Sequence, residues 1–349
     1  MANGELLRQL FKGFSKRDDA VFRAAANALI SEERLKNHRL LADDLERILL
    51  NGAHDTSTRR NANAPLDLPK DRERGFPLVD VAEPDYGWER LVALPKTLLT
   101  LRALAEEHHR RDVLASGGLR PRRKALFFGP PGCGKTLAAQ VLAGVLARPL
   151  VTVRFDAVVS SYLGETAANL HRVFDFIERG EWIVLFDEFD AIGKDRDNPF
   201  EHGELKRVVN TLLQLMDAYR GNSLLIAATN HEGLLDEAIW RRFEAVVHFG
   251  APSEQDRVLL LRLFLRGFDT SNVNFRSVAH RTPGATGSDI ELITVEAARA
   301  AVLAGRTHLH MADMDASIAA FHDRRAAAKG AARIAPRPPA PKRQKRPGA

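Results

Sequence analysis

Short, dense runs of hydrophobic residues alternate with helical patterns along the middle of this 349-residue chain. Such density, without the alternation of a half-exposed strand, is typical of strands that are buried on both faces. Segments between the runs, such as TLAAQVLAGVLA and NLHRVFDFIERG, have the spacing of helices. The pattern predicts an α/β fold with a doubly wound parallel sheet of five strands. The five runs are ALFFG from residue 125, LVTVRF from 150, WIVLFDE from 182, SLLIAATN from 223 and AVVHFG from 245.

The ends of the chain have different patterns. Residues 1–52 carry apolar positions at helical spacing and predict a small helical unit. Residues 53–75, rich in Asn, Thr, Pro and charge, are predicted to be a linker to an α/β domain over 76–250. Residues 251–328 show helical patterns without a strand, which predicts an all-helical domain, and we expect a disordered tail over 329–349.

Charge is concentrated in the tail. The formal net charge is +6, and residues 330–349 hold six Lys and Arg with no acidic residue. The remainder has 45 basic and 45 acidic residues and is formally neutral. The tail is interpreted as a solubilising extension, and contact with nucleic acid or an acidic partner is the alternative.

The cysteine count and the hydropathy of the chain indicate the cellular compartment of the protein. Cys133 is the single cysteine, so no internal disulfide can form, which favours a reducing cytoplasm. No apolar run has the length of a membrane span, and charge interrupts the N-terminus too early for a secretory signal. We therefore expect a cytoplasmic protein without a membrane span.

The segment GPPGCGKT, residues 129–136, follows a predicted strand and precedes a predicted helix. This spacing is that of a phosphate-binding loop, in which backbone N–H groups surround phosphates at a helix N-terminus. Lys135 is expected to reach the β and γ phosphates of ATP, and the Thr136 hydroxyl to ligate Mg²⁺. The expected nucleotide-binding residues of this loop are Pro130, Pro131, Gly132, Cys133, Gly134, Lys135, Thr136 and Leu137.

A second motif, which is acidic, follows the third predicted strand. IVLFDEFD places Asp187 and Glu188 at the carboxyl end of that strand, where parallel sheets bind ligands. An aspartate there can hold Mg²⁺, and the neighbouring carboxylate can deprotonate an attacking water. We assign Asp187 to the metal and Glu188 to catalysis.

With these motifs the chain resembles the AAA ATPase family over residues 76–325. The resemblance implies a P-loop NTPase domain followed by a helical lid. It also implies roles for Asn230 at the end of LIAATN, which would position water, and for Gly287 and Ser288 in GATGSDIELI, which would contact nucleotide. By the same resemblance, residues near DYGWERLV, which begins at residue 85, would form the adenine pocket.

In the same resemblance, LDEAIWRRFE matches the segment that carries arginine fingers. Arg241 and Arg242 would therefore act on the nucleotide of a neighbouring subunit in a hexamer. The alternative interpretation is that both arginines lie at a solvent-exposed helix end. The compact RRFE sequence resembles the branch of the AAA clade that contains spastin and katanin-like enzymes. The chain as a whole resembles a single-module, stand-alone AAA protein of bacterial type.

The stretch YLG lies between the second predicted strand and the next helix. In this family such an aromatic–hydrophobic–glycine pattern faces the central channel, so Tyr162, Leu163 and Gly164 are predicted to grip a polypeptide. Burial of Tyr162 in the core is the alternative.

The leading functional hypothesis is an ATP-driven, hexameric unfoldase or disassembly enzyme that threads a protein substrate through its pore. No HExxH motif occurs in the sequence, so proteolysis would require a separate protease partner. The alternatives are a nucleic-acid-associated motor that uses the basic tail, and an ATP-switched regulator that does not thread its substrate.

Overall fold

The computed structural model describes residues 24–26, 28–29, 67–72, 75–159, 163–189, 201–231, 233 and 237–334. The chain divides into two compact units, Met1–Asp67 and Leu68–Ala349. Residues 24–26 and 28–29 of the first unit are helical, and the rest of the predicted N-terminal helical unit lies outside the described residues.

The five predicted strands are present and form the parallel part of one sheet. Strands β4 and β5 are buried along their whole length, as their dense hydrophobic runs predict. The strand order is β1-β3-β4-β5-β2-β6, so β2 and β3, which follow one another in the chain, are not neighbours in the sheet and are joined by a crossover. The five are β2 (Lys124–Phe128), β3 (Leu150–Val153), β4 (Ile183–Phe186), β5 (Leu224–Thr229) and β6 (Ala245–His248).

A sixth strand corrects the predicted strand number. β1 (Val79–Ala82) pairs with β3 in antiparallel orientation at the edge of the sheet. Its sequence is VDVA, in which Val79 is fully buried and Asp80 is exposed. Four residues with a polar position among them give a weak hydrophobic signal, which explains why the sequence did not reveal this edge strand.

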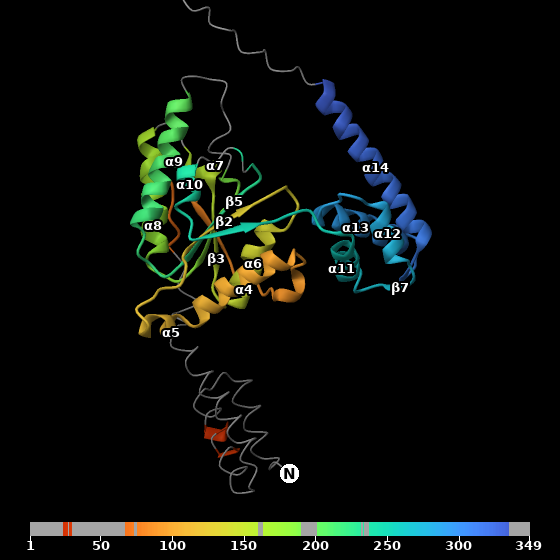
Figure 1. The fold of residues 1–349 in the computed structure, drawn as a ribbon, viewed down its shortest axis with the longest axis horizontal. Helices are drawn as coiled ribbons and strands as arrows, with labels where there is room; N and C mark the ends of the chain where they lie inside the picture. The colour runs from red at the N-terminus through yellow and green to blue at the C-terminus, as the bar shows by residue number, and fades with distance from the viewer. Residues whose placement is uncertain are drawn as a thin grey trace, which may run out of the picture. The chain divides into compact units, whose positions relative to one another are not determined.

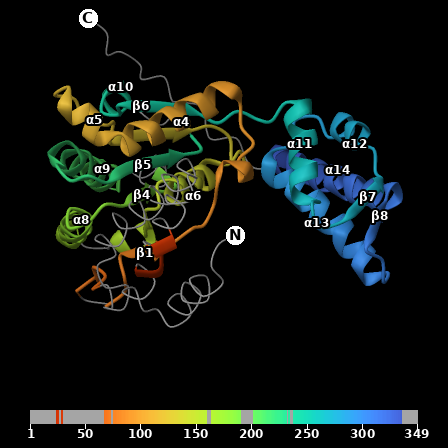
Figure 2. The ribbon, with the colours of Figure 1, turned by 90° about the horizontal axis from the view of Figure 1, so that it is seen from below.

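Helices cover both faces of the sheet (Figures 1 and 2). One face packs against α4 (Pro95–His109) and α6 (Lys135–Val145), and the other against α8 (Leu163–Ile177) and α9 (Glu201–Ala218). Strand β4 contributes to both cores, because Ile183 and Leu185 face the α4–α6 side and Val184 and Phe186 the other. The described residues of this part also form the short helices α5 (Arg111–Ser116), α7 (Phe155–Val158) and α10 (Glu237–Trp240) and a 3-10 helix at Trp88–Arg90.

The C-terminal part is helical, as predicted, and has its own hydrophobic core. One detail differs from the expected all-helical domain, because β7 (Asp269–Asn272) and β8 (His308–His310) form a small parallel pair. β7 reads DTSN and contains no hydrophobic residue, so no hydrophobic pattern could predict it. The helices of this part, which we call the lid, are α11 (Glu254–Phe264), α12 (Phe275–Arg281), α13 (Gly287–Leu303) and α14 (Met311–Ile334).

Two predicted boundaries differ from the structure. Residues 68–72 and 75, assigned above to the linker, belong to the second unit, where Lys70 and Pro77 form a β-bridge and Asp71 is buried. Helix α14 continues to Ile334, past the expected start of the tail at 329. The Ala-rich sequence AAAKGAARI favours this extension because alanine has the highest helix propensity. Residues 335–349 lie outside the described residues.

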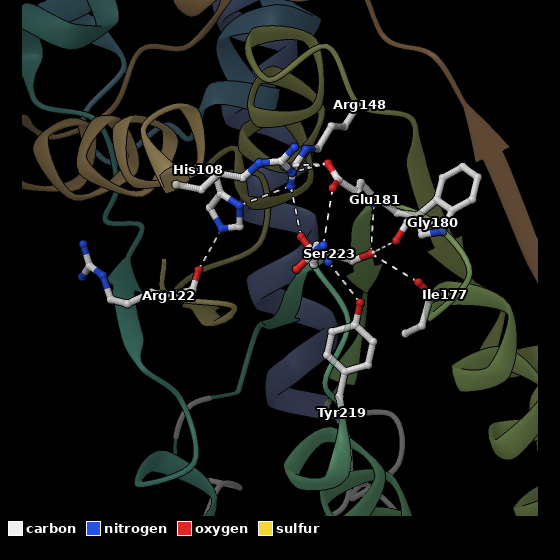
Figure 3. Close-up of polar contacts among 11 residues, drawn as sticks. His108, Arg122, Arg148, Ile177, Gly180, Glu181, Tyr219 and Ser223 are labelled. Carbon is white, nitrogen blue, oxygen red and sulfur yellow. Dashed lines mark hydrogen bonds and ion pairs between the residues drawn. The ribbon is translucent and has the colours of Figure 1, made fainter. Parts of the chain in front are cut away.

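A polar network joins the segments that precede the strands (Figure 3). His108, at the end of α4, is buried, and its Nε2 lies 2.8 Å from the carbonyl of Arg122. Nη1 of Arg148 lies 3.2 Å from Nδ1 of His108, and Nη2 donates to Glu181 over 3.1 Å. Glu181 also pairs with Arg111 at 2.5 Å. Because Arg148 is a donor only, Nδ1 accepts and Nε2 donates, so His108 is neutral.

Helix lengths and hydropathies bear on membrane insertion. Within the described ranges, no helix combines the length and hydropathy needed to cross a bilayer.

Candidate active site

The loop Gly129–Thr136 connects β2 to α6, as its sequence predicts. Gly134 is the N-cap of α6 with a φ of 92°, and Lys135 is the first residue of the helix. The Lys135 ammonium is buried and donates to the carbonyls of Gly129 at 2.8 Å and Pro130 at 2.9 Å. These contacts place the cation on the inner side of the loop, at a helix N-terminus whose dipole also favours an anion.

Gly132 brings the lid against this loop. Its φ is 73°, and a Cβ there would lie 2.8 Å from Oγ1 of Thr286. The N–H of Ser288 donates to the Gly132 carbonyl over 3.1 Å, at the first turn of α13. Thr286 and Asp289 form a capping box that holds this turn. The structure thus brings the predicted residues Gly287 and Ser288 to the phosphate-binding loop.

Asp187 and Glu188 follow β4, next to the loop. The Thr136 hydroxyl donates to Oδ2 of Asp187 over 2.7 Å, and the N–H of Glu188 donates to Oδ1 over 2.8 Å. Glu188 has a φ of 50°, a left-handed conformation that is unusual outside glycine. The Glu188 side chain is exposed, which leaves its carboxylate accessible to water. Both carboxylates therefore stand at the mouth of the loop, with Asp187 as the inner one.

One cavity of about 700 Å³ gathers most of the predicted residues. Asn230, which follows β5, lines it together with the two carboxylates. Pro130 is not among the lining residues described, although its carbonyl binds the Lys135 ammonium. The predicted residues that line the cavity are Pro131, Gly132, Cys133, Gly134, Lys135, Thr136, Leu137, Asp187, Glu188, Asn230, Gly287 and Ser288.

One wall of the cavity comes from the segment that precedes α4. Tyr86, Arg90 and Leu91 lie in the predicted adenine-pocket segment, and the Arg90 guanidinium stands 4.2 Å from the centre of the Tyr86 ring. The backbone of Tyr86 runs so close to α6 that a Cβ on Gly144 would collide with it. A flat aromatic and cationic surface of this kind can stack on a heterocyclic base.

Sequence reasoning missed several lining residues. Gln140 lies one helical turn after Thr136 on α6, so its i+4 spacing could have identified it. Leu263, Phe264 and Arg266, at the end of α11, had no local signal, because their proximity to the loop depends on how the lid folds back. The lid therefore completes a cavity that the α/β domain alone leaves open.

Cys133 lies in the phosphate-binding loop with little exposure. Burial raises the pKa of its thiol above the usual range, and the nearby Lys135 charge opposes this only in part. The thiol is therefore protonated near neutral pH and acts as a small packing group rather than a nucleophile.

Comparison with known proteins identifies the family. The model of the ATPase family associated with various cellular activities (AAA) matches residues 125–251, and that of the AAA+ lid domain matches residues 272–325. A protein of Sinorhizobium fredii named uncharacterized AAA family ATPase y4kL is 38% identical over 336 residues, which cover 96% of this chain and 99% of that protein. The chain belongs to the AAA ATPase family.

Other relatives of this AAA ATPase are named proteasome-activating nucleotidases. The one from Pyrococcus abyssi is 34% identical over 248 residues, which cover 68% of this chain and 62% of that protein. The one from Methanococcus maripaludis is 29% identical over 260 residues, which cover 72% of this chain and 64% of that protein. These relatives fit the AAA clade proper, and the chain spans less than two thirds of their length. Membership of this family makes the chain an enzyme that binds nucleotide and hydrolyses ATP.

The two predicted arginine fingers of this AAA ATPase lie outside the nucleotide cavity. Arg241 and Arg242 follow α10, and neither is among the described residues that line the cavity. Arg241 is exposed, whereas Arg242 is half-buried and pairs with Asp217 through Nε at 3.0 Å. Helix α10 lies on the side of the sheet away from the lid helices (Figures 1 and 2). Within one chain the structure does not bring the arginines to the carboxylates.

The predicted pore segment is described only in part. Tyr162 lies outside the described residues. Leu163 and Gly164 are the first two residues of α8, rather than part of the preceding connection as predicted. The substrate-gripping role of this segment stays a prediction.

Proposed function

We propose that this AAA ATPase is a protein-remodelling motor that draws a polypeptide through the pore of a hexameric ring at the expense of Mg²⁺-ATP. The observation that carries the proposal is that Lys135, Asp187, Glu188 and Asn230 share one cavity while the arginine pair lies outside it. Such a site is completed by a second subunit. The relatives named proteasome-activating nucleotidases support a role in handling protein substrates for a separate protease.

The residues present fit a magnesium ion. The hydroxyl of Thr136 and the carboxylate of Asp187 lie 2.7 Å apart, and hard oxygen donors of this kind suit Mg²⁺ alongside phosphate oxygens. When bound, the ion would neutralise charge on the β and γ phosphates. Thr136 and Asp187 are therefore the proposed metal-binding residues.

The chain's own groups would then divide the work of hydrolysis. Lys135 exchanges its contacts with the loop carbonyls for phosphate oxygens, which holds the γ-phosphoryl group in place. Glu188 accepts a proton from the attacking water, because its exposed carboxylate stands at the cavity mouth. Asn230 orients that water from the neighbouring strand.

The arginine pair is proposed to act in trans. Each subunit would present Arg241 and Arg242 to the nucleotide of its neighbour and stabilise charge in the transition state. An interface that joins two different surfaces generates a ring when its rotation closes. This requirement, with the family relationship, supports a closed hexamer.

Substrate grip is assigned to Tyr162, Leu163 and Gly164. A ring of aromatic side chains can hold an extended chain with little sequence preference, since the contact uses apolar faces and backbone. We further propose that the helical unit of residues 1–52 recruits the substrate.

The decisive experiment compares Tyr162→Ala with Tyr162→Phe in ATPase, ring assembly and unfolding of a tagged fluorescent protein. The alanine variant should hydrolyse ATP within a few-fold of the parent and lose unfolding, and the phenylalanine variant should retain both. Tyr219→Ala is the matched control for a buried tyrosine and should lower the melting temperature, since truncating a large aromatic side chain costs roughly 3–5 kcal/mol. If Tyr162→Ala behaves like Tyr219→Ala, or unfolds substrate normally, the threading proposal is wrong.

A further inference from the structure

The loop between α12 and α13 contains a tight turn. The N–H of Ala285 donates to the carbonyl of Thr282 over 3.2 Å, which closes a β-turn. Pro283 and Gly284 are its two central residues, and Gly284 has a φ of 68°. Proline followed by glycine at positive φ is typical of a type II turn. The carbonyl of Pro283 belongs to the central peptide, whose orientation distinguishes type II from type I turns.

Side chains of α14 contact the backbone of this loop. The helix packs along α13 and reaches α12 (Figure 2). Nη1 of Arg325 donates to the carbonyl of Pro283 over 2.9 Å, and a Cβ on Gly284 would lie 3.2 Å from Nη2. About one turn earlier along α14, Nε2 of His322 donates to the carbonyl of Arg281 over 3.0 Å. The two side chains thus hold the end of α12 and the centre of the turn against α14.

The other end of the loop lies on the phosphate-binding loop. The N–H of Ser288 donates to the carbonyl of Gly132, and a Cβ on Gly287 would lie 3.1 Å from the same oxygen. All three residues line the nucleotide cavity. Three residues, 284–286, separate Pro283 from Gly287. Because this connection is so short, the conformation of the turn limits where the first turn of α13 can lie.

Fold stability does not explain the Arg325 contact. Pro283 and Gly284 are exposed, so water can satisfy the same carbonyl, and the hydrogen bond adds little to the free energy of unfolding. What the contact does affect is the population of the turn, because rotation of the central peptide would carry the carbonyl away from the guanidinium. Arg324, the preceding residue, instead pairs with Glu296 of α13 at 2.9 Å. Of the two adjacent arginines, Arg325 is therefore the one that holds the turn.

We propose that Arg325 is a positioning residue for nucleotide binding, which holds the type II turn and so keeps Gly287 and Ser288 against the phosphate-binding loop. This rests on the proposed binding of ATP in the cavity that these residues line. Without the contact, the turn samples both orientations of its central peptide, and the first turn of α13 is closed on the loop for a smaller share of the time. ATP then finds fewer competent molecules, while catalysis in the bound state is unchanged.

The test measures the Kd for a fluorescent ATP analogue and kcat at saturating ATP on the full-length protein. Arg325→Ala should raise Kd by roughly ten-fold, which corresponds to a competent fraction of about one tenth. kcat and the melting temperature should stay near the parental values, since Arg325 is not among the described residues that line the cavity. Arg325→Lys keeps a cationic donor and should stay close to the parent in Kd.

Arg324→Ala is the matched control at the adjacent position. It removes an arginine and an ion pair with α13 but leaves the Pro283 carbonyl held, so Kd should stay at the parental value. His322→Ala should raise Kd in the same direction as Arg325→Ala, because it releases the carbonyl at the end of α12.

A double-mutant cycle tests whether the effect is transmitted through the loop. Ser288→Pro removes the N–H that contacts Gly132, and proline is tolerated in the first turn of a helix. This variant should itself weaken ATP binding, because the contact between α13 and the phosphate-binding loop is lost. Arg325→Ala should then cause little further loss of affinity in the Ser288→Pro background, since the two substitutions break the same connection.

The outcomes separate two failures. If Arg325→Ala leaves Kd unchanged, raises it no more than Arg324→Ala, or adds its full effect to Ser288→Pro, the positioning role is refuted while ATP binding in the cavity stands. A lower melting temperature with a proportionate loss of kcat in Arg325→Ala also refutes it, in favour of a structural role. If Lys135→Ala binds ATP as tightly as the parent, the nucleotide does not occupy the cavity, and the role of Arg325 fails with it.

Discussion

The Thr136 hydroxyl donates to Oδ2 of Asp187 over 2.7 Å, although the two residues are 51 positions apart in the chain. The contact joins the start of α6 to the end of β4. It brings together an oxygen of the phosphate-binding loop and an oxygen of the acidic motif IVLFDEFD, which are separate in the sequence.

This contact predicts how magnesium dependence responds to substitution. Thr136→Val keeps the shape of the side chain and removes its oxygen, so half-maximal ATPase should need at least ten-fold more Mg²⁺. Thr136→Ser retains the hydroxyl and should stay close to the parent. Titration of steady-state phosphate release with MgCl₂ measures this, and chelation with EDTA should abolish turnover in all three proteins. Equal Mg²⁺ requirements for the valine and serine variants would refute the metal assignment.

Lys135 and Glu188 are predicted to fail in different ways. Lys135→Ala should lose nucleotide binding, because the ammonium is the buried cation of the loop. Glu188→Gln should bind ATP normally and hydrolyse it slowly, by the roughly 10²–10⁴-fold expected for loss of a general base. Equilibrium binding of a fluorescent ATP analogue, followed by single-turnover hydrolysis, separates the two effects. Equal loss of binding in both variants would contradict this division.

The backbone of Glu188 predicts an unusual order of stability. At its φ of 50°, a side chain with a Cβ is strained by roughly 1–2 kcal/mol, and glycine is not. Glu188→Gly should therefore be more stable to urea than Glu188→Ala by about 1 kcal/mol.

Glu106, exposed within α4, is the matched control. There the order should reverse, because glycine in a helix interior is about 1 kcal/mol less favourable than alanine. The same order at both positions would show that residue 188 is not held in the left-handed region.

The network of His108 predicts a stability loss in acid. Burial, with smaller effects of the nearby Arg148 and Arg111 charges, lowers the pKa of His108 from 6.5 to about 4. The hydrogen bond with the Arg122 carbonyl and the charge of Glu107 oppose this shift in part. The unfolded chain therefore binds more protons than the folded one between these values. Above about pH 6.5, His108 is neutral in both states and should not affect the free energy of unfolding. As the pH falls to about 4, its protonation in the unfolded chain should lower that free energy by about 3 kcal/mol.

His108→Gln should remove this share of the pH dependence, and His109→Gln, at the exposed neighbouring position, should preserve it. Urea unfolding followed by tryptophan fluorescence is a suitable measurement, because all three tryptophans, Trp88, Trp182 and Trp240, lie in the second unit. If the three proteins lose stability alike between pH 7 and 5, the network does not control acid sensitivity.

Much of the fold was determined by local sequence. The five parallel strands could be predicted because burial on both faces requires continuous hydrophobic runs, and each run is visible within a few residues. The loop of residues 129–136 could be predicted for a similar reason, since its glycines, Lys135 and Thr136 are adjacent in the chain. Family resemblance then extended these motifs to Asn230, Gly287 and Ser288, which the structure brings to the same cavity.

Other features were decided only by tertiary structure. The edge strand β1 has only a weak hydrophobic pattern and β7 has none, so both depend on pairing with a partner strand. The placement of Phe264 and Arg266 in the cavity depends on how the lid folds onto the loop. The contacts of Asp217 with Arg242 and of His108 with Arg148 join residues that are 25 and 40 positions apart in the chain. Contacts of that range leave no periodic signal, because packing against the sheet selects them rather than the propensity of either segment.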